Sequence, residues 1–192
     1  MIYPEFIKEK GTIGVPAPSA GADTVQRKNK MQNARKPFED LGYKLELSKN
    51  LLKCENGRSS TAEERANEIN EMFRRKDIDL ILCASGGDFL MEMLPYVEFE
   101  LLKNNPKFVA GFSDPTGLLY PITTKYDIAT IYGHNFSSFG MEKLHQSQKE
   151  FLEIIKGNLL LEHSFDLYEN GYVEAITGLE YYNLTEKVYW KT

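Results

Sequence analysis

Short apolar runs alternate with stretches of helical periodicity over the first 157 residues, and this alternation restricts the possible folds more than any other feature. The run at 79–87, DLILCASGG, is apolar almost throughout, which is typical of a strand covered on both faces of a parallel sheet. The alternation predicts further strands at 11–17, 43–48, 107–113 and 128–133. It predicts helices at 23–41, 59–76, 89–96, 97–104, from 115 onward and at 145–156.

Two helix ends carry local signals. Ser60 with Glu63, or Thr61 with Glu64, has the spacing of a capping box at a helix start. Gly42 follows a helical stripe, where a glycine commonly ends a helix in the left-handed conformation.

Strands and helices alternate with connections long enough for crossovers, so we expect a doubly wound, mainly parallel α/β sheet with flanking helices. Ligands bind such sheets beyond the carboxyl ends of the strands. Three of these ends are distinctive: ASGGD at 84–88, GFSDPT at 111–116 and YGHN at 132–135. We expect one α/β domain over 1–157 and a connection or tail over 158–192.

Composition narrows the possible partners. The net charge is −5 with acidic and basic residues interspersed, and no basic patch is interleaved with aromatics, so nucleic acid is not an expected partner. No apolar stretch approaches 18 residues, so we expect no membrane contact and a cytoplasmic protein. Cys54 and Cys83 form neither a disulfide framework nor a metal motif, and Cys83 is expected to be a small core residue.

Two interpretations fit Ser113-Asp114-Pro115 at the end of a predicted strand. In the structural one, Asp114 is the N-cap and Pro115 the first residue of a helix, with an unstrained serine. In the chemical one, Ser113 sits on a sharp elbow with positive φ, and the Asp114 N–H and helix dipole stabilise an oxyanion. Gly111 suits such an elbow, but Pro115 replaces the second glycine of G-x-S-x-G.

The Gly86-Gly87 pair is also open to several interpretations. It can expose N–H groups to a ligand, or it can be a plain turn with Asp88 capping the next helix. A phosphate-binding loop has little support, because neither G-x-G-x-x-G nor a following Lys-Ser/Thr is present. If the third and fourth strands are adjacent, Gly86-Gly87 and Ser113 meet at one edge of the sheet.

The order of several motifs resembles the LD-carboxypeptidase family, serine peptidase family S66. The matching stretches are VPAPS at 15–19, LGY at 41–43, Arg65, the block SGGDFLMEMLPYVEFELLKNNPKFVAGFSDPT at 85–116, and YG at 132–133. That family includes muramoyl-tetrapeptide carboxypeptidases and microcin C immunity peptidases, and the resemblance covers about residues 13–140.

The resemblance implies a flavodoxin-like or class I glutamine-amidotransferase-like domain without a cofactor or metal. It implies an acyl-enzyme on Ser113, with oxyanion donors from Gly86, Gly87 and the Asp114 N–H. The substrate would be a small murein-type or microcin-type peptide, cleaved at an amide bond near a free carboxylate.

This chain differs from the family pattern in two ways that limit what the resemblance implies. Many family members carry arginine before the glycine pair, where this chain has Ser85, which favours the microcin-immunity branch. We expect Ser85, Asp88 and His134 to contact substrate. The family's catalytic glutamate and histidine lie in a C-terminal domain, and no residue among these 192 takes their positions. We therefore expect little activity from this chain alone; the alternative is a non-catalytic peptide-binding module.

Other titratable residues receive simpler interpretations. His134 is a weak candidate for a substitute base, because the sequence shows no orienting partner. His145 and His163 are expected at the surface. Three acids are expected on solvated helix faces: Glu92, Glu98 and Glu100.

The tail from 158 onward contains six aromatic residues after residue 167: Tyr168, Tyr172, Tyr181, Tyr182, Tyr189 and Trp190. Aromatic side chains bury large areas, and contiguous apolar patches are uncommon on monomers. We expect the tail to fold back on its own sheet or to pair with a second copy, giving a homodimer.

Overall fold

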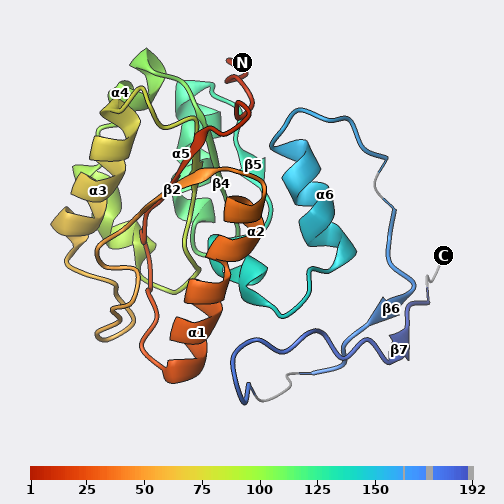
Figure 1. Cartoon of the computed structure of the whole chain (residues 1–192). Helices are drawn as coiled ribbons and strands as arrows, with labels where there is room; N and C mark the ends of the chain where they lie inside the picture. Colours follow the sequence, from red (N-terminus) through yellow and green to blue (C-terminus); the bar gives the residue numbers. More distant parts are fainter. Residues whose placement is uncertain (162, 172–174, 190–192) are drawn as a thin grey trace.

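The computed structural model describes residues 1–161, 163–171 and 175–189. Its centre is a five-stranded sheet in the order β2-β1-β3-β4-β5, with every neighbouring pair parallel (Figure 1). The strands are β1 Thr12–Val15, β2 Lys44–Leu47, β3 Leu80–Leu82, β4 Phe108–Gly111 and β5 Ile131–Tyr132. The predicted doubly wound α/β fold is confirmed, with strands shorter than the apolar runs that indicated them.

Helices cover both faces of this sheet. The α-helices are α1 Val25–Asn33, α2 Arg35–Asp40, α3 Ala62–Arg74, α4 Phe99–Asn104, α5 Thr116–Tyr126 and α6 Gln146–Ile154. Two 3₁₀ helices are η1 Leu90–Tyr96 and η2 Phe136–Gly140. No described helix is long and apolar enough to cross a membrane.

One predicted helix is divided into two. The pattern over 23–41 predicted a single helix, but Ala34 separates α1 from α2. Pro37 lies in the first turn of α2 and has no N–H to donate to the carbonyl of Asn33. The helical hydrogen-bond pattern therefore cannot run unbroken through this point.

Both local helix-end signals are present. Thr61 is the N-cap of α3, and its hydroxyl accepts the N–H of Glu64, so the second of the two proposed capping pairs marks the start. Gly42 has φ +84° and donates to the carbonyl of Glu39, which ends α2 as expected.

Alternation along the strands divides the core into two layers. Leu80 and Leu82 of β3 pack in the layer with α1, α2 and α6, whereas Ile81 and Cys83 pack in the layer with α3, η1 and α5. Cys83 is fully buried, as predicted, and burial raises the pKa of its thiol to about 12.

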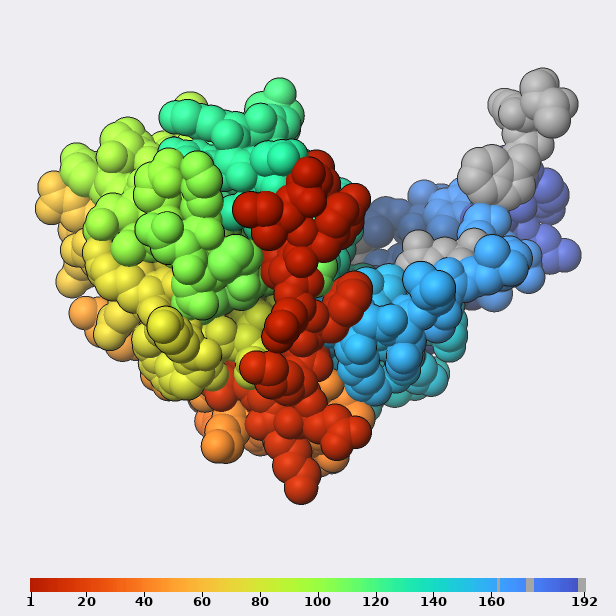
Figure 2. All heavy atoms as spheres, turned by 90° about the horizontal axis from the view of Figure 1, so that it is seen from above, coloured from red at the N-terminus to blue at the C-terminus, as the bar shows by residue number. Residues whose placement is uncertain are grey.

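The N-terminal segment crosses the side of the molecule where the strands begin. Ile2 donates to the carbonyl of Asp127 just before β5, and Ile7 donates to the carbonyl of Ile155 after α6. Figure 2 shows this segment in red, lying between the green and blue parts of the chain. This segment covers the end of the sheet where the strands begin. The opposite end, where the strands finish, is the usual ligand site in such sheets.

The tail forms its own small element away from the sheet. β6 Leu167–Tyr168 and β7 Glu186–Lys187 pair antiparallel, and Figures 1 and 2 show this part of the chain projecting to one side. Thr177 lies between these strands in the chain, and its carbonyl accepts a hydrogen bond from the Asn29 side chain. The part of the tail around Thr177 therefore lies against α1. The described part of the tail thus folds back in part on the α/β domain, through contacts with α1 and with the segment before α6, although none of its residues extends the five-stranded sheet.

The tail aromatics have different environments. Tyr181 and Tyr182 lie against His145, which is half-buried and caps α6 rather than being a simple surface residue. Tyr168 and Tyr189 are exposed. Tyr172 and Trp190 lie outside the described residues, and His163 is exposed as expected.

Candidate active site at the carboxyl edge of the sheet

The turns after β3 and β4 lie side by side. Leu82 of β3 pairs in register with Ala110 of β4, so both strands end at the same edge. A Cβ atom built on Gly86 would lie 3.2 Å from both Cβ and Oγ of Ser113. The predicted adjacency of the glycine turn and the serine is therefore confirmed.

Ser113 occupies a strained backbone conformation directly after β4. Its φ of +66° lies in the left-handed region, which costs a residue with a Cβ roughly 1–2 kcal/mol. Gly111 makes room for the bend, because a Cβ there would lie 3.0 Å from both the side-chain oxygen of Asn135 and Cβ of Pro115. Ser113 itself is exposed. The chain forms the predicted elbow and not an unstrained helix entry.

Asn135 holds the elbow from the side of β5. Its Oδ1 accepts the N–H of Phe112 at 3.1 Å, and its Nδ2 donates to the carbonyl of Phe112 at 3.2 Å. The side chain is buried and replaces the backbone partner that a neighbouring strand would supply. Sequence reasoning missed this residue, although it noted the YGHN stretch that contains it.

Asp114 links the elbow to two other loops. Its Oδ2 accepts the N–H of Leu90 at 2.9 Å and the hydroxyl of Ser19. Asp114 therefore is not the N-cap of α5, and the structural one of the two interpretations is wrong on this point. Pro115 precedes the helix without a side-chain cap. Ser19 is fully buried, which fixes this link in the interior.

The glycine turn after β3 packs against the loop after β1. A Cβ on Gly87 would lie 2.2 Å from Oγ of Ser19, so no side chain fits there. The hydroxyl of Ser85 donates to the carbonyl of Ala20 at 2.6 Å. The Ser85 hydroxyl therefore has a structural partner in the loop after β1.

Free backbone donors lie on both sides of the serine. Within the described residues, no hydrogen bond joins the N–H of Gly87 or of Asp114 to another group. A pair of free N–H groups beside a serine hydroxyl is the arrangement that stabilises a tetrahedral oxyanion. Asp88 is exposed and does not cap η1, which begins after Phe89 without a side-chain cap.

A cavity of about 400 Å³ opens between the loop after β1 and the turn after β3. These strands are neighbours at the point where the strand order reverses, which is the usual ligand crevice of a doubly wound sheet. The cavity is lined by Ala20, Gly21, Ala22, Arg27, Lys30, Met31, Cys54, Gly57, Ser85, Gly86, Gly87, Asp88 and Ser137. Four predicted site residues thus share one cavity.

His134 lies elsewhere. It lines a separate cavity that also includes Phe112 and Tyr182, and its Nε2 is 3.1 Å from Oγ of Ser147. Burial lowers the pKa of the His134 imidazole, and the nearby His145 adds to the shift. No hydrogen bond within the described part of the chain joins His134 to Ser113.

A buried arginine holds the loop after β1 and the segment after β3 together. Arg65 of α3 is fully buried and donates to the carbonyls of Pro18 at 3.0 Å and Phe89 at 2.9 Å. Its guanidinium also pairs with Glu92 at 3.0 Å. The prediction that Glu92 lies on a merely solvated face is therefore wrong, whereas Glu98 and Glu100 are exposed as expected.

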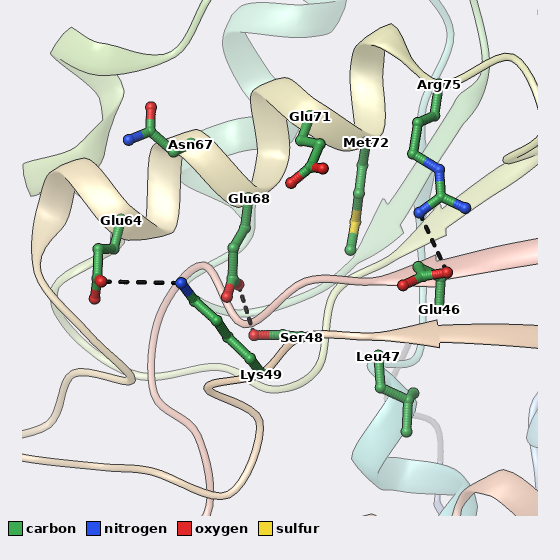
Figure 3. Close-up of a pocket in the computed structure, with 10 residues that line it drawn as sticks. All are labelled: Glu46, Leu47, Ser48, Lys49, Glu64, Asn67, Glu68, Glu71, Met72 and Arg75. Atoms are coloured by element: carbon green, nitrogen blue, oxygen red, sulfur yellow. Dashed lines mark hydrogen bonds and ion pairs between the residues drawn. The ribbon is translucent and has the colours of Figure 1, made fainter.

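Another cavity lies at the far edge of the sheet, between β2 and α3 (Figure 3). Figure 3 shows Lys49 facing Glu64, and Arg75 facing Glu46. The nitrogen–oxygen distances of these ion pairs are 4.0 and 3.2 Å respectively. Most of its charges have partners, and it contains no predicted site residue. The carboxyl edge is therefore the better candidate site.

The sequence profile of the LD-carboxypeptidase N-terminal domain, peptidase S66, matches residues 13–133. The chain belongs to the LD-carboxypeptidase family. This match confirms the resemblance inferred from the motifs, and the fold is also similar to that of the solved microcin C7 self-immunity protein MccF.

Three similar proteins illustrate the relationship. The microcin C7 self-immunity protein MccF of Escherichia coli is 38% identical over 64% of this chain and 35% of its own length. A Bacillus subtilis protein named "Probable murein peptide carboxypeptidase" is 29% identical over 76% of this chain and 45% of its own. The structure of MccF in complex with aspartyl sulfamoyl adenosine has a TM-score of 0.76 and 30% identity, covering 100% of this chain and 58% of that one. This chain thus spans less than two thirds of the length of each.

Proposed function

We propose that Ser113 is the nucleophile of a serine-type carboxypeptidase that forms an acyl-enzyme with a small peptide. The observation that carries this proposal is the left-handed φ of Ser113 beside the Gly86 turn, at the carboxyl edge of the sheet. Strained residues of this kind cluster at active sites, where surrounding contacts hold them in place.

The proposed chemistry follows from this geometry. The Ser113 hydroxyl loses its proton to a base as Oγ attacks the scissile carbonyl carbon, and the carbonyl oxygen becomes an oxyanion. The N–H groups of Gly87 and Asp114 and the N-terminal end of α5 are placed to stabilise that charge. Collapse expels the amine with a proton and leaves an ester on Ser113, which water then hydrolyses.

The general base is proposed to come from outside these 192 residues. His134 is bonded to Ser147, so the described histidine nearest in sequence to the elbow is directed elsewhere. A serine hydroxyl is a weak nucleophile without a base. We therefore expect this chain alone to bind peptide but to turn it over slowly.

The substrate is proposed to be a small peptide with a free carboxylate, of the microcin or murein type. Names of similar proteins include both a microcin self-immunity protein and a murein peptide carboxypeptidase. Ser85 before the glycine pair favours the microcin type.

A chimera tests the proposal. Residues 13–133 would replace the corresponding segment of the Escherichia coli microcin C7 self-immunity protein, and release of an amino acid or nucleotide from a microcin-type substrate would be measured. We expect activity that Ser113→Ala abolishes, whereas Ser60→Ala, at a surface serine bonded to Glu64, leaves it unchanged. An active chimera that retains its rate with Ser113→Ala would contradict the proposal.

A non-catalytic peptide-binding role is the second candidate, favoured by the engagement of His134 with Ser147. It predicts that the folded chimera binds peptide but stays inactive, with or without the Ser113 hydroxyl. The same assay therefore separates the two functions.

A further inference from the structure

The cavity beside the glycine turn has one wall made by α1, and that wall is cationic. Arg27 and Lys30, three residues apart on α1, both line this cavity together with Ser85–Asp88. Side chains three apart on a helix lie on the same face, so the two cations reach the cavity together.

These two cations differ in their availability to a ligand. Arg27 pairs with Asp23 at 3.1 Å, so its charge is partly neutralised. Lys30 has no carboxylate within 4.0 Å among the described residues and is half-buried. Burial lowers the pKa of its ammonium, while Glu180 acts in the opposite direction.

Glu180 lies on the far side of these cations, in the tail. Arg27, Lys30 and Glu180 also line a second cavity between α1 and the tail. The Glu180 carboxylate is already occupied by the N–H groups of Ile176, Thr177 and Gly178. Glu180 therefore leaves the ammonium of Lys30 without a direct ion-pair partner.

We propose that Lys30, assisted by Arg27, binds the free carboxylate of the peptide substrate in this cavity. This assignment rests on the proposed peptidase function and adds the residues that recognise the substrate. Gly86 is shared between the cavity wall and the immediate surroundings of Ser113. A peptide whose carboxylate contacts Lys30 therefore extends toward the serine. A volume of about 400 Å³ falls in the usual range for small-ligand sites.

Equilibrium binding to the chain as it stands tests this assignment, because binding needs no base and no Ser113 hydroxyl. The probes are N-acetyl-L-lysyl-D-alanine, its C-terminal amide, and inorganic phosphate, titrated into ¹⁵N-labelled protein. We expect the acid to shift the amide signals of residues 85–88 and to bind about tenfold more tightly than the amide. Lys30→Met should remove this preference, and Lys30→Gln should do the same if the methionine variant fails to fold.

Lys28→Met is the matched control, since Lys28 lies on the same helix but lines neither cavity. It should leave the preference for the acid unchanged. Equal affinity of acid and amide for the wild-type chain would overturn the assignment. So would a Lys30→Met variant that retains the preference, or phosphate binding as tight as the acid. A folded chimera that is inactive with Ser113 in place, together with intact Lys30-dependent binding by this chain, would refute the nucleophile proposal alone.

Discussion

At position 113, glycine should give a more stable chain than alanine, although glycine normally weakens a structure. The left-handed φ of +66° costs a residue with a Cβ roughly 1–2 kcal/mol, and glycine avoids that cost. Glycine in turn loses more conformational freedom on folding, which costs about 0.5–1 kcal/mol relative to alanine. The balance lies between about 0 and 1.5 kcal/mol, and the middle of that range, about 0.5–1 kcal/mol, favours Ser113→Gly over Ser113→Ala.

Thermal and urea unfolding, followed by circular dichroism, measure this difference. At roughly 2–4 °C per kcal/mol for a chain of this size, Ser113→Gly should unfold about 1–4 °C above Ser113→Ala. The comparison with alanine matters, because both variants lose the hydroxyl and only one keeps Cβ.

Ser60 supplies the control pair, because it is not among the described residues with positive φ. There Ser60→Gly should be less stable than Ser60→Ala. If Ser113→Gly is also less stable than Ser113→Ala, by a margin like that at Ser60, the elbow is not strained. The argument that a strained serine marks the active site would then fail.

Four further outcomes are expected. Arg65→Met should lower the free energy of unfolding by about 3–5 kcal/mol, because it removes a buried charge from its hydrogen-bond acceptors. Arg74 is exposed on the same helix, so Arg74→Met should cost no more than about 1 kcal/mol. Similar losses for the two variants in urea titrations would contradict this prediction. Asn135→Ala should cost about 1–3 kcal/mol by leaving buried backbone groups unpaired, and unchanged stability would rule out its support of the elbow. The pKa of the His134 imidazole should lie below 6.5 when it is measured by NMR titration. As the pH falls below 6.5, the unfolded chain binds a proton at this residue more readily than the folded chain, so the free energy of unfolding should decrease. His134→Gln should reduce this dependence of stability on pH. Truncation after Gly157 should convert the expected homodimer to a monomer in light scattering, and a monomer before truncation would refute self-association through the tail.

Local sequence patterns predicted the features that depend on neighbours in the chain. Apolar runs located all five strands of the main sheet, and turn chemistry predicted the caps at Thr61 and Gly42. The elbow at Ser113 belongs to the same class, because its positive φ follows from a strand that turns sharply into a helix. The break at Pro37 was a local signal that the apolar stripe concealed.

The side-chain partners could not be predicted, because they depend on which strands are neighbours. Asp114 bonds Ser19 from 95 positions earlier in the chain, and Asn135 reaches back 23 positions to Phe112. A local pattern made helix capping the simplest role for Asp114, but the order of the strands brought two better donors to its carboxylate. His134 was considered for its chemistry and Asn135 was not considered, although an amide can both donate and accept and so suits a strand end.

The contacts around Ser113 indicate which part of a catalytic site this sheet builds by itself. The elbow is held by Asn135 from the loop after β5, and through Asp114 by Ser19 from the loop after β1. Leu90, which follows the turn after β3, supplies a further donor to Asp114. Each of these partners belongs to the α/β domain, so the strained serine needs no base to hold its conformation. Positioning of the nucleophile and activation of its proton are therefore separable, and the stability of the Ser113 variants reports on the first without requiring the second.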